Sequence, residues 1–177
     1  MKPSITISKS SNSLTGNMLF IHNSIETFKI ELSKSNLNED DMVYFYNRLV
    51  EISRHRKIVN KFLTECPDKD VKSAFDMLNE LAQQEKQIEI ILNSNLKEQN
   101  MDYEDLMSQK QKNAMNNFKS LLVMASKRVK VSDNKELSIK DIKFLKEKFN
   151  KLDEEGVKPS LVQNAFIKTI DEIEESL

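Results

Sequence analysis

MVYFYNRLVEISRHRKIVNKFL, residues 42–63, is the stretch that decides the fold of this chain. Large apolar side chains recur in it at intervals of three and four residues, which places them on one side of an α-helix. Such a helix must bury its apolar side against other elements. Seven positions form the stripe and six of them are apolar: Met42, Phe45, Leu49, Ile52, Arg56, Val59 and Leu63.

The same spacing recurs along the rest of the chain and predicts five further helices. The chain has only two glycines and three prolines, too few for the turns of a sheet protein. The sequence therefore predicts an all-α fold, an antiparallel bundle of about six helices. The expected helices cover residues 17–35, 38–66, 67–95, 102–131, 138–155 and 160–177.

We expect these helices to form a four-helix body, residues 17–131, and a C-terminal helical hairpin, residues 138–177, packed on that body. The polar loop between them would be residues 132–137. Residues 1–16 contain seven Ser or Thr and no acidic residue, and we expect them to form a flexible arm.

Composition excludes several classes of protein. A net charge of −1 argues against a surface built for polyanions. Cys66, the one cysteine, excludes an internal disulfide. No apolar run approaches the ~20 residues that span a bilayer, and no apolar core of a cleavable signal peptide follows Met1. We therefore expect a soluble, cytoplasmic protein, or one exported without a cleavable signal.

The residue types that carry catalysis or bind metals are sparse. His22 and His55 are the only histidines, and the paired Glu-x-x-His motifs of a di-metal bundle are absent. We interpret both as solvated and Cys66 as a helix-junction residue. The sequence predicts no enzyme, no metal and no cofactor.

Two charges interrupt otherwise apolar stripes, Arg56 in residues 42–63 and Glu85 in the helix that follows. If these two helices form a hairpin that turns near Pro67, Glu85 lies opposite Arg48, and Asp76 lies opposite Arg56. We therefore expect Arg48–Glu85 and Arg56–Asp76 ion pairs at the rim of the core, with a structural role.

Some large apolar residues lie off the stripes. Tyr44, Phe45 and Tyr46 are consecutive, so they span about 200° of the helix and cannot all face one core. Other helices of the bundle could cover the outward residues, or the residues could mark a partner site. The candidate partner-binding residues are Phe20, Tyr44, Tyr46, Ile90 and Ile91.

These observations favour a non-enzymatic module that binds another protein, or a second copy of itself, as an adaptor, regulator or effector. The alternative is a nucleic-acid-binding regulator that uses a basic helix face, Arg54, Lys57 and Lys61, which the net charge disfavours. The arm, residues 1–16, is similar in composition to uncleaved export signals of specialised bacterial secretion substrates, including type III systems. That resemblance implies an exported effector.

Overall fold

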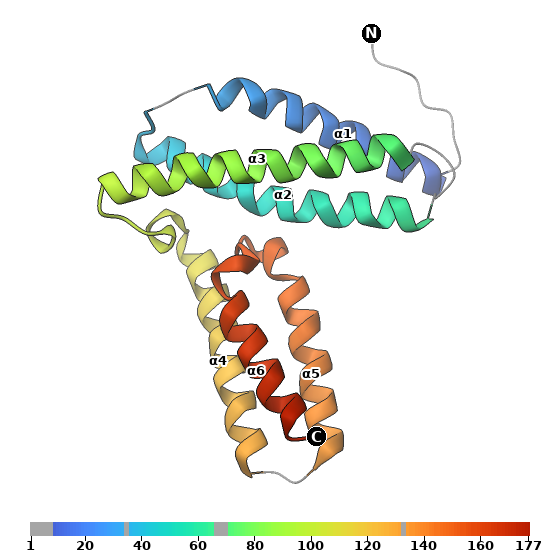
Figure 1. The fold of residues 1–177 in the computed structure, drawn as a ribbon, viewed down its shortest axis with the longest axis vertical. Helices are drawn as coiled ribbons and strands as arrows, with labels where there is room; N and C mark the ends of the chain where they lie inside the picture. The colour runs from blue at the N-terminus through green and yellow to red at the C-terminus, as the bar shows by residue number, and fades with distance from the viewer. Residues whose placement is uncertain (1–8, 34–35, 66–70, 132–133) are drawn as a thin grey trace. The chain divides into compact units, whose positions relative to one another are not determined.

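The fold was determined as a computed structural model that describes residues 9–33, 36–65, 71–131 and 134–177. Within these residues the chain forms six α-helices, three short 3₁₀ helices and no strand, which confirms the all-α expectation (Figure 1). The chain divides into two compact units, residues 1–102 and 103–177. This division differs from the expected one, because the helix at 109–131 groups with the two C-terminal helices and leaves three α-helices in each unit.

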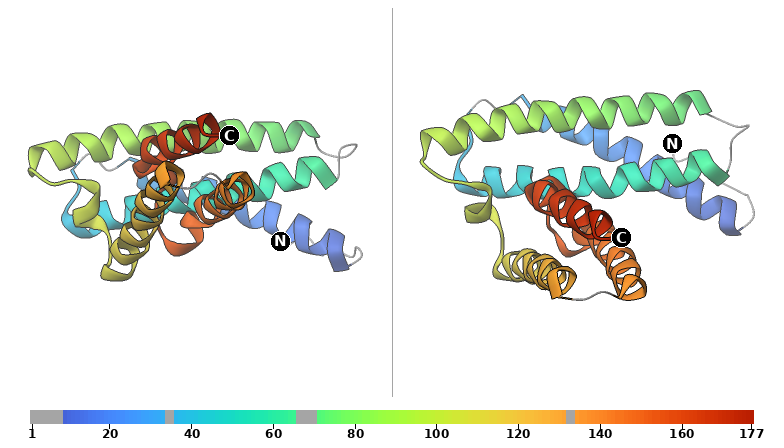
Figure 2. Two further views of the ribbon diagram at one scale, coloured as in Figure 1. Left: turned by 90° about the horizontal axis from the view of Figure 1, so that it is seen from below. Right: turned by 60° about the horizontal axis from the view of Figure 1, so that its bottom comes forward.

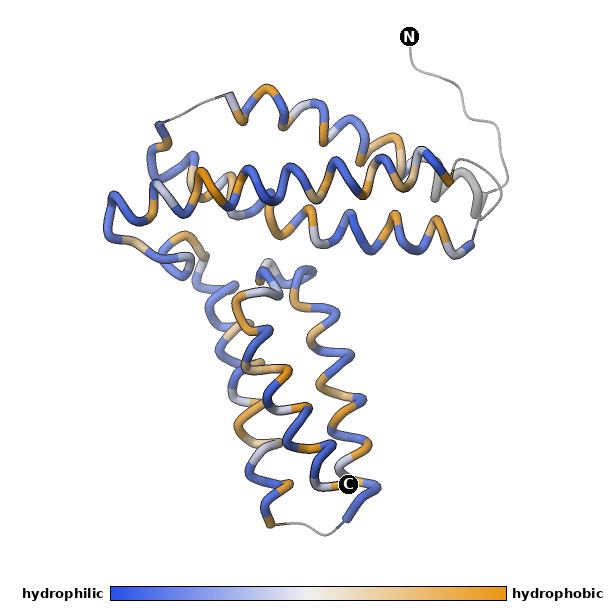
Figure 3. Tube along the Cα trace, viewed as in Figure 1, coloured by the Kyte–Doolittle hydropathy of each residue, from blue (hydrophilic) through white to orange (hydrophobic). Residues whose placement is uncertain are grey.

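The first unit consists of α1 (Lys9–Glu31), α2 (Glu39–Glu65) and α3 (Val71–Glu98). The helices α2 and α3 run antiparallel side by side, and α1 packs against both (Figures 1 and 2). Apolar residues recur turn by turn along each helix (Figure 3). The predicted stripes supply the buried residues Met18, Ile21, Ile25, Phe28, Met42, Phe45, Leu49, Ile52, Val59, Ala74, Leu81, Ile88 and Leu92.

The starts of α1 and α2 differ in how well the sequence predicts them. For α2 the expected start is confirmed, since the Asn38 side chain accepts from the Asp41 amide at 2.8 Å and Asp41 accepts from the Asn38 amide at 3.2 Å. For α1 the expected flexible arm is wrong over residues 9–16, which are helical. Serine and threonine lower helix propensity only moderately, so this segment can extend the helix. Residues 1–8 and Cys66 lie outside the described residues.

Three further helix starts, in the second unit, lie several residues from their expected positions. Helix α4 starts at Gln109 and not at Asp102, because Ser108 and Gln111 cap each other's backbone amides at 2.8 and 3.2 Å. The Asn134 side chain caps α5, which shortens the expected loop 132–137. The elements are η1 (Tyr103–Leu106), α4 (Gln109–Val131), α5 (Lys135–Asn150), η2 (Leu152–Glu155), η3 (Pro159–Leu161) and α6 (Gln163–Glu175).

An aromatic cluster joins the three α-helices of the second unit. The rings of Phe149 on α5 and Phe166 on α6 stack with their centroids 4.2 Å apart. Phe118 on α4 lies 6.1 and 6.0 Å from these two rings. Aromatic pairs at such distances stabilise packing beyond the area they bury. The cluster explains why α4 belongs with α5 and α6.

Gly156 holds a backbone conformation that a side chain would strain, with a φ of 80°. A Cβ there would lie 2.5 Å from the Nε2 atom of Gln111, whose side chain caps α4. We expect Gly156→Ala to lower the free energy of unfolding by about 1–2 kcal/mol in urea denaturation. The control is Gly16→Ala within α1, where a Cβ meets nothing within 4 Å. An equal loss in both variants would contradict this explanation.

Candidate functional site

A surface hollow of about 650 Å³ lies between α1 and α3. Its apolar lining comes from Leu32, in the turn that follows α1, and from Ile90 and Ile91 on α3. Ile90 is 61% exposed because it lies on the side of α3 away from the buried stripe that contains Ile88 and Leu92. The polar rim consists of Lys29, Ser33, Glu80, Gln83 and Gln87, and the buried side chain of Gln84 lies at the base of the hollow.

A second, smaller hollow of about 230 Å³ lies on the other flank of α1, against α2. It contains two of the residues that the sequence singled out, Phe20 and Tyr44, which are 62% and 49% exposed. Both rings rest on buried side chains. Phe20 meets the His55 ring edge to face at 6.0 Å, and Tyr44 stacks on Phe28 at 5.3 Å. Because buried neighbours hold both rings in place, the rings lose little conformational entropy when a partner covers their apolar surface.

The prediction that Tyr46 contributes to a partner surface is wrong. Its side chain is completely buried. Consecutive helix positions differ by about 100°, so Tyr44 and Tyr46 lie on opposite sides of Phe45, and only Tyr44 remains accessible. Four of the five candidate residues therefore line the two hollows beside α1.

Beneath these hollows lies a buried polar network that the sequence analysis missed. The guanidinium of Arg48 donates to Gln84 at 2.9 Å and pairs with Glu51. The Gln84 amide in turn donates to the backbone carbonyl of Ile25 at 2.7 Å. The network therefore links α2 to α3 and α3 to α1. The side chain of Arg48 also lies over the Phe28 ring, 5.3 Å from its centroid.

The expected partners of Arg48 and Arg56 are both wrong. Arg56 pairs with Glu85 at 3.3 Å, where Asp76 was expected, and Arg48 pairs within its own helix and with Gln84. Asp76 and Glu85 lie nine residues apart on α3, so the alignment assumed from a turn near Pro67 did not fix which acid Arg56 would meet.

His55 belongs to the same network, and its expected solvated position is also wrong. It is buried, with its Nδ1 atom 3.4 Å from the Arg48 guanidinium. Burial, with the charges of Arg48 and Arg54 adding to it, lowers the pKa of His55 to about 4, against the opposing effect of Glu51. The imidazole is therefore neutral near pH 7. Such a residue is a poor candidate for proton transfer at neutral pH.

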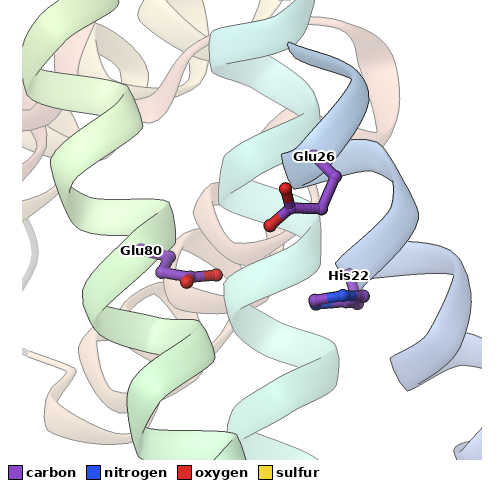
Figure 4. A group of neighbouring side chains, drawn as sticks. All are labelled: His22, Glu26 and Glu80. Carbon is purple, nitrogen blue, oxygen red and sulfur yellow. The ribbon is translucent and has the colours of Figure 1, made fainter. Parts of the chain in front are cut away.

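The other histidine, His22, is exposed on α1 and points toward Glu26 and Glu80 (Figure 4). Their nitrogen and oxygen atoms lie within 4.8 Å of one another, and such atoms can bind a divalent metal. Lys29 already contacts both carboxylates, at 3.0 and 3.8 Å, and its hydrogen bond to Glu26 raises the pKa of Lys29. Because this ammonium opposes a second cation, we assign the group as an ion-pair cluster between α1 and α3.

The basic face that the sequence suggested for nucleic acid lies on α2. Arg54, Lys57 and Lys61 are exposed, and Lys61 lies 3.9 Å from Glu65 on the same helix. The face borders neither hollow. It carries no aromatic residue on which a base could stack.

Comparison with known proteins adds no relative. No family model, curated protein or solved structure matches this chain. Across the residues that the structure describes, every helix is too short or too polar to cross a lipid bilayer. The function must therefore be inferred from the surfaces themselves.

Proposed function

We propose that the first unit is a non-enzymatic protein-binding module and that the hollow between α1 and α3 is its docking site. The observation that carries this proposal is Ile90, a large apolar side chain that is 61% exposed inside a hollow of about 650 Å³. Protein interfaces combine an apolar centre with a polar rim. Here Leu32, Ile90 and Ile91 supply the centre, and Lys29 and Glu80 belong to the rim.

The smaller hollow extends this surface along the other flank of α1. Phe20 and Tyr44 belong to residue types that are enriched at protein interfaces, and both are held by buried neighbours. A partner that covered α1 could engage both hollows. These features support protein binding over catalysis, since the polar network beneath the hollows is buried and its histidine is neutral near pH 7.

We expect Ile90→Asp to reduce recovery of the partner about tenfold in an affinity pull-down from native lysate, without changing the thermal midpoint. A charge at the centre of an apolar contact opposes binding, whereas an exposed substitution alters stability by only about 0.5 kcal/mol. Phe75→Asp is the matched control, because Phe75 is 54% exposed on the same helix and does not line the hollow. Recovery is measured by quantitative mass spectrometry.

Two outcomes would contradict the proposal. If Ile90→Asp and Phe75→Asp lose the partner equally, the hollow between α1 and α3 is not the docking site. Recovery that disappears on nuclease treatment would instead favour the basic face formed by Arg54, Lys57 and Lys61.

A further inference from the structure

A third concave surface lies in the second unit, between the neighbouring helices α4 and α6. The groove has a volume of about 510 Å³. Leu122, Val123 and Ala165 are its apolar lining, and Val123 is 53% exposed. This groove shares no residue with the hollows of the first unit, so it is independent of the function proposed above.

Lysines surround this apolar lining. Lys119, Lys127 and Lys130 share one side of α4 with Val123, because their spacing is four, four and three residues. Lys168 contributes a fourth ammonium from α6. The groove therefore has cations on both of its walls.

Few of these charges are neutralised within the unit. Lys119 lies 3.8 Å from Glu104. Among the described residues, no carboxylate lies within ion-pair distance of Lys127, Lys130 or Lys168. Among the described residues that line the groove, the one acidic residue is Glu172, which accepts a hydrogen bond from Ser126 at 2.9 Å. The groove therefore keeps an excess of positive charge beside apolar surface.

We propose that the groove between α4 and α6 binds an acidic amphipathic helix from a partner protein. Two neighbouring helices form a trough for a third helix, which would place apolar residues over Val123 and its own carboxylates beside the lysines. A nucleic acid would contact the lysines but would gain nothing from Val123 and Ala165. The lining residues that the structure describes include no aromatic side chain for base stacking. The combination of apolar lining and positive rim favours the acidic helix.

Fluorescence anisotropy on the full chain tests this proposal. The probes are a panel of labelled helical peptides of about 18 residues, with leucines along one side and glutamates along its flanks. The control peptides replace each glutamate with lysine, and a single-stranded oligonucleotide of similar charge serves as the nucleic-acid probe. We expect the acidic peptides to bind, the basic peptides not to bind, and binding to weaken as salt concentration rises.

Matched variants locate the binding. We expect Lys127→Glu combined with Lys168→Glu to weaken binding of the acidic peptides about tenfold or more. The control combines Lys140→Glu with Lys143→Glu, which changes the net charge equally on the exposed side of α5 and should bind as the wild type does. Circular dichroism confirms that each variant keeps its helical content.

Several results would overturn the proposal. The first is absence of binding by every acidic peptide. The second is equal weakening by the two double variants, which would indicate only a general effect of net charge. Tight binding of the oligonucleotide that Lys127→Glu combined with Lys168→Glu abolishes, while the acidic peptides fail to bind, would assign the groove to nucleic acid instead.

Discussion

Replacing Arg48 by alanine is expected to lower the free energy of unfolding by about 2–4 kcal/mol. Arg48 is buried, and its guanidinium meets Gln84, Glu51 and the face of Phe28. Alanine leaves the side-chain oxygen of Gln84 without this donor and opens a cavity where the long arginine stem lies. Urea denaturation followed by circular dichroism measures the loss.

Arg56→Ala is the matched control, since Arg56 lies on the same helix and also pairs with an acid from α3. Its side chain is 36% exposed and that of Glu85 is 25% exposed, so solvent screens the pair. We expect this variant to lose about 1 kcal/mol or less. If the two variants lose similar amounts of unfolding free energy, the buried network stabilises the fold no more than the Arg56–Glu85 pair does.

The second large effect is a dependence of stability on pH that comes from His55. Its pKa is lowered to about 4 in the folded protein, against about 6.5 in an unfolded chain. Between these two values the unfolded chain binds a proton more readily than the folded protein does. The folded state is therefore fully stabilised above pH 6.5 and loses that stability as the pH falls toward 4.

Between pH 7 and pH 5 the free energy of unfolding is expected to fall by about 2 kcal/mol through this effect. Few carboxylates titrate in this pH range. The free energy of unfolding is measured across this range for the wild type and for His55→Leu, which removes the buried titrating group. We expect the wild type to lose stability and the variant to remain nearly constant. The control is His22→Leu at an exposed position, which should retain the slope of the wild type. A slope that persists in His55→Leu would assign the effect to other groups.

The helices and much of the core were predictable from the sequence because their causes are local. Met42, Phe45, Leu49 and Ile52 are buried as their spacing required. The start of α2 follows from the capping residue Asn38. The predicted start of α4 was wrong, although the sequence contains the two capping residues, Ser108 and Gln111, that mark the observed start.

The candidate site was only partly predictable. A helical wheel shows that Tyr44 and Tyr46 cannot share a core with Phe45, but it does not show which of them another helix covers. The structure covers Tyr46 and leaves Tyr44 half exposed beside Phe20. His55 and Arg48 were unpredictable in the same sense, since their burial depends on Phe20 and Phe28 from α1.

The sequence by itself determined that this protein is helical, where most of its helices lie and which side of each is apolar. Those properties depend on contacts between residues three and four positions apart. Only the tertiary structure decided that the described helices divide three and three, that α1 borders two hollows, and that α4 and α6 carry lysines on both sides of a groove. An apolar stripe requires burial but does not specify its partner helix, so surfaces formed between helices appear only once the packing is known.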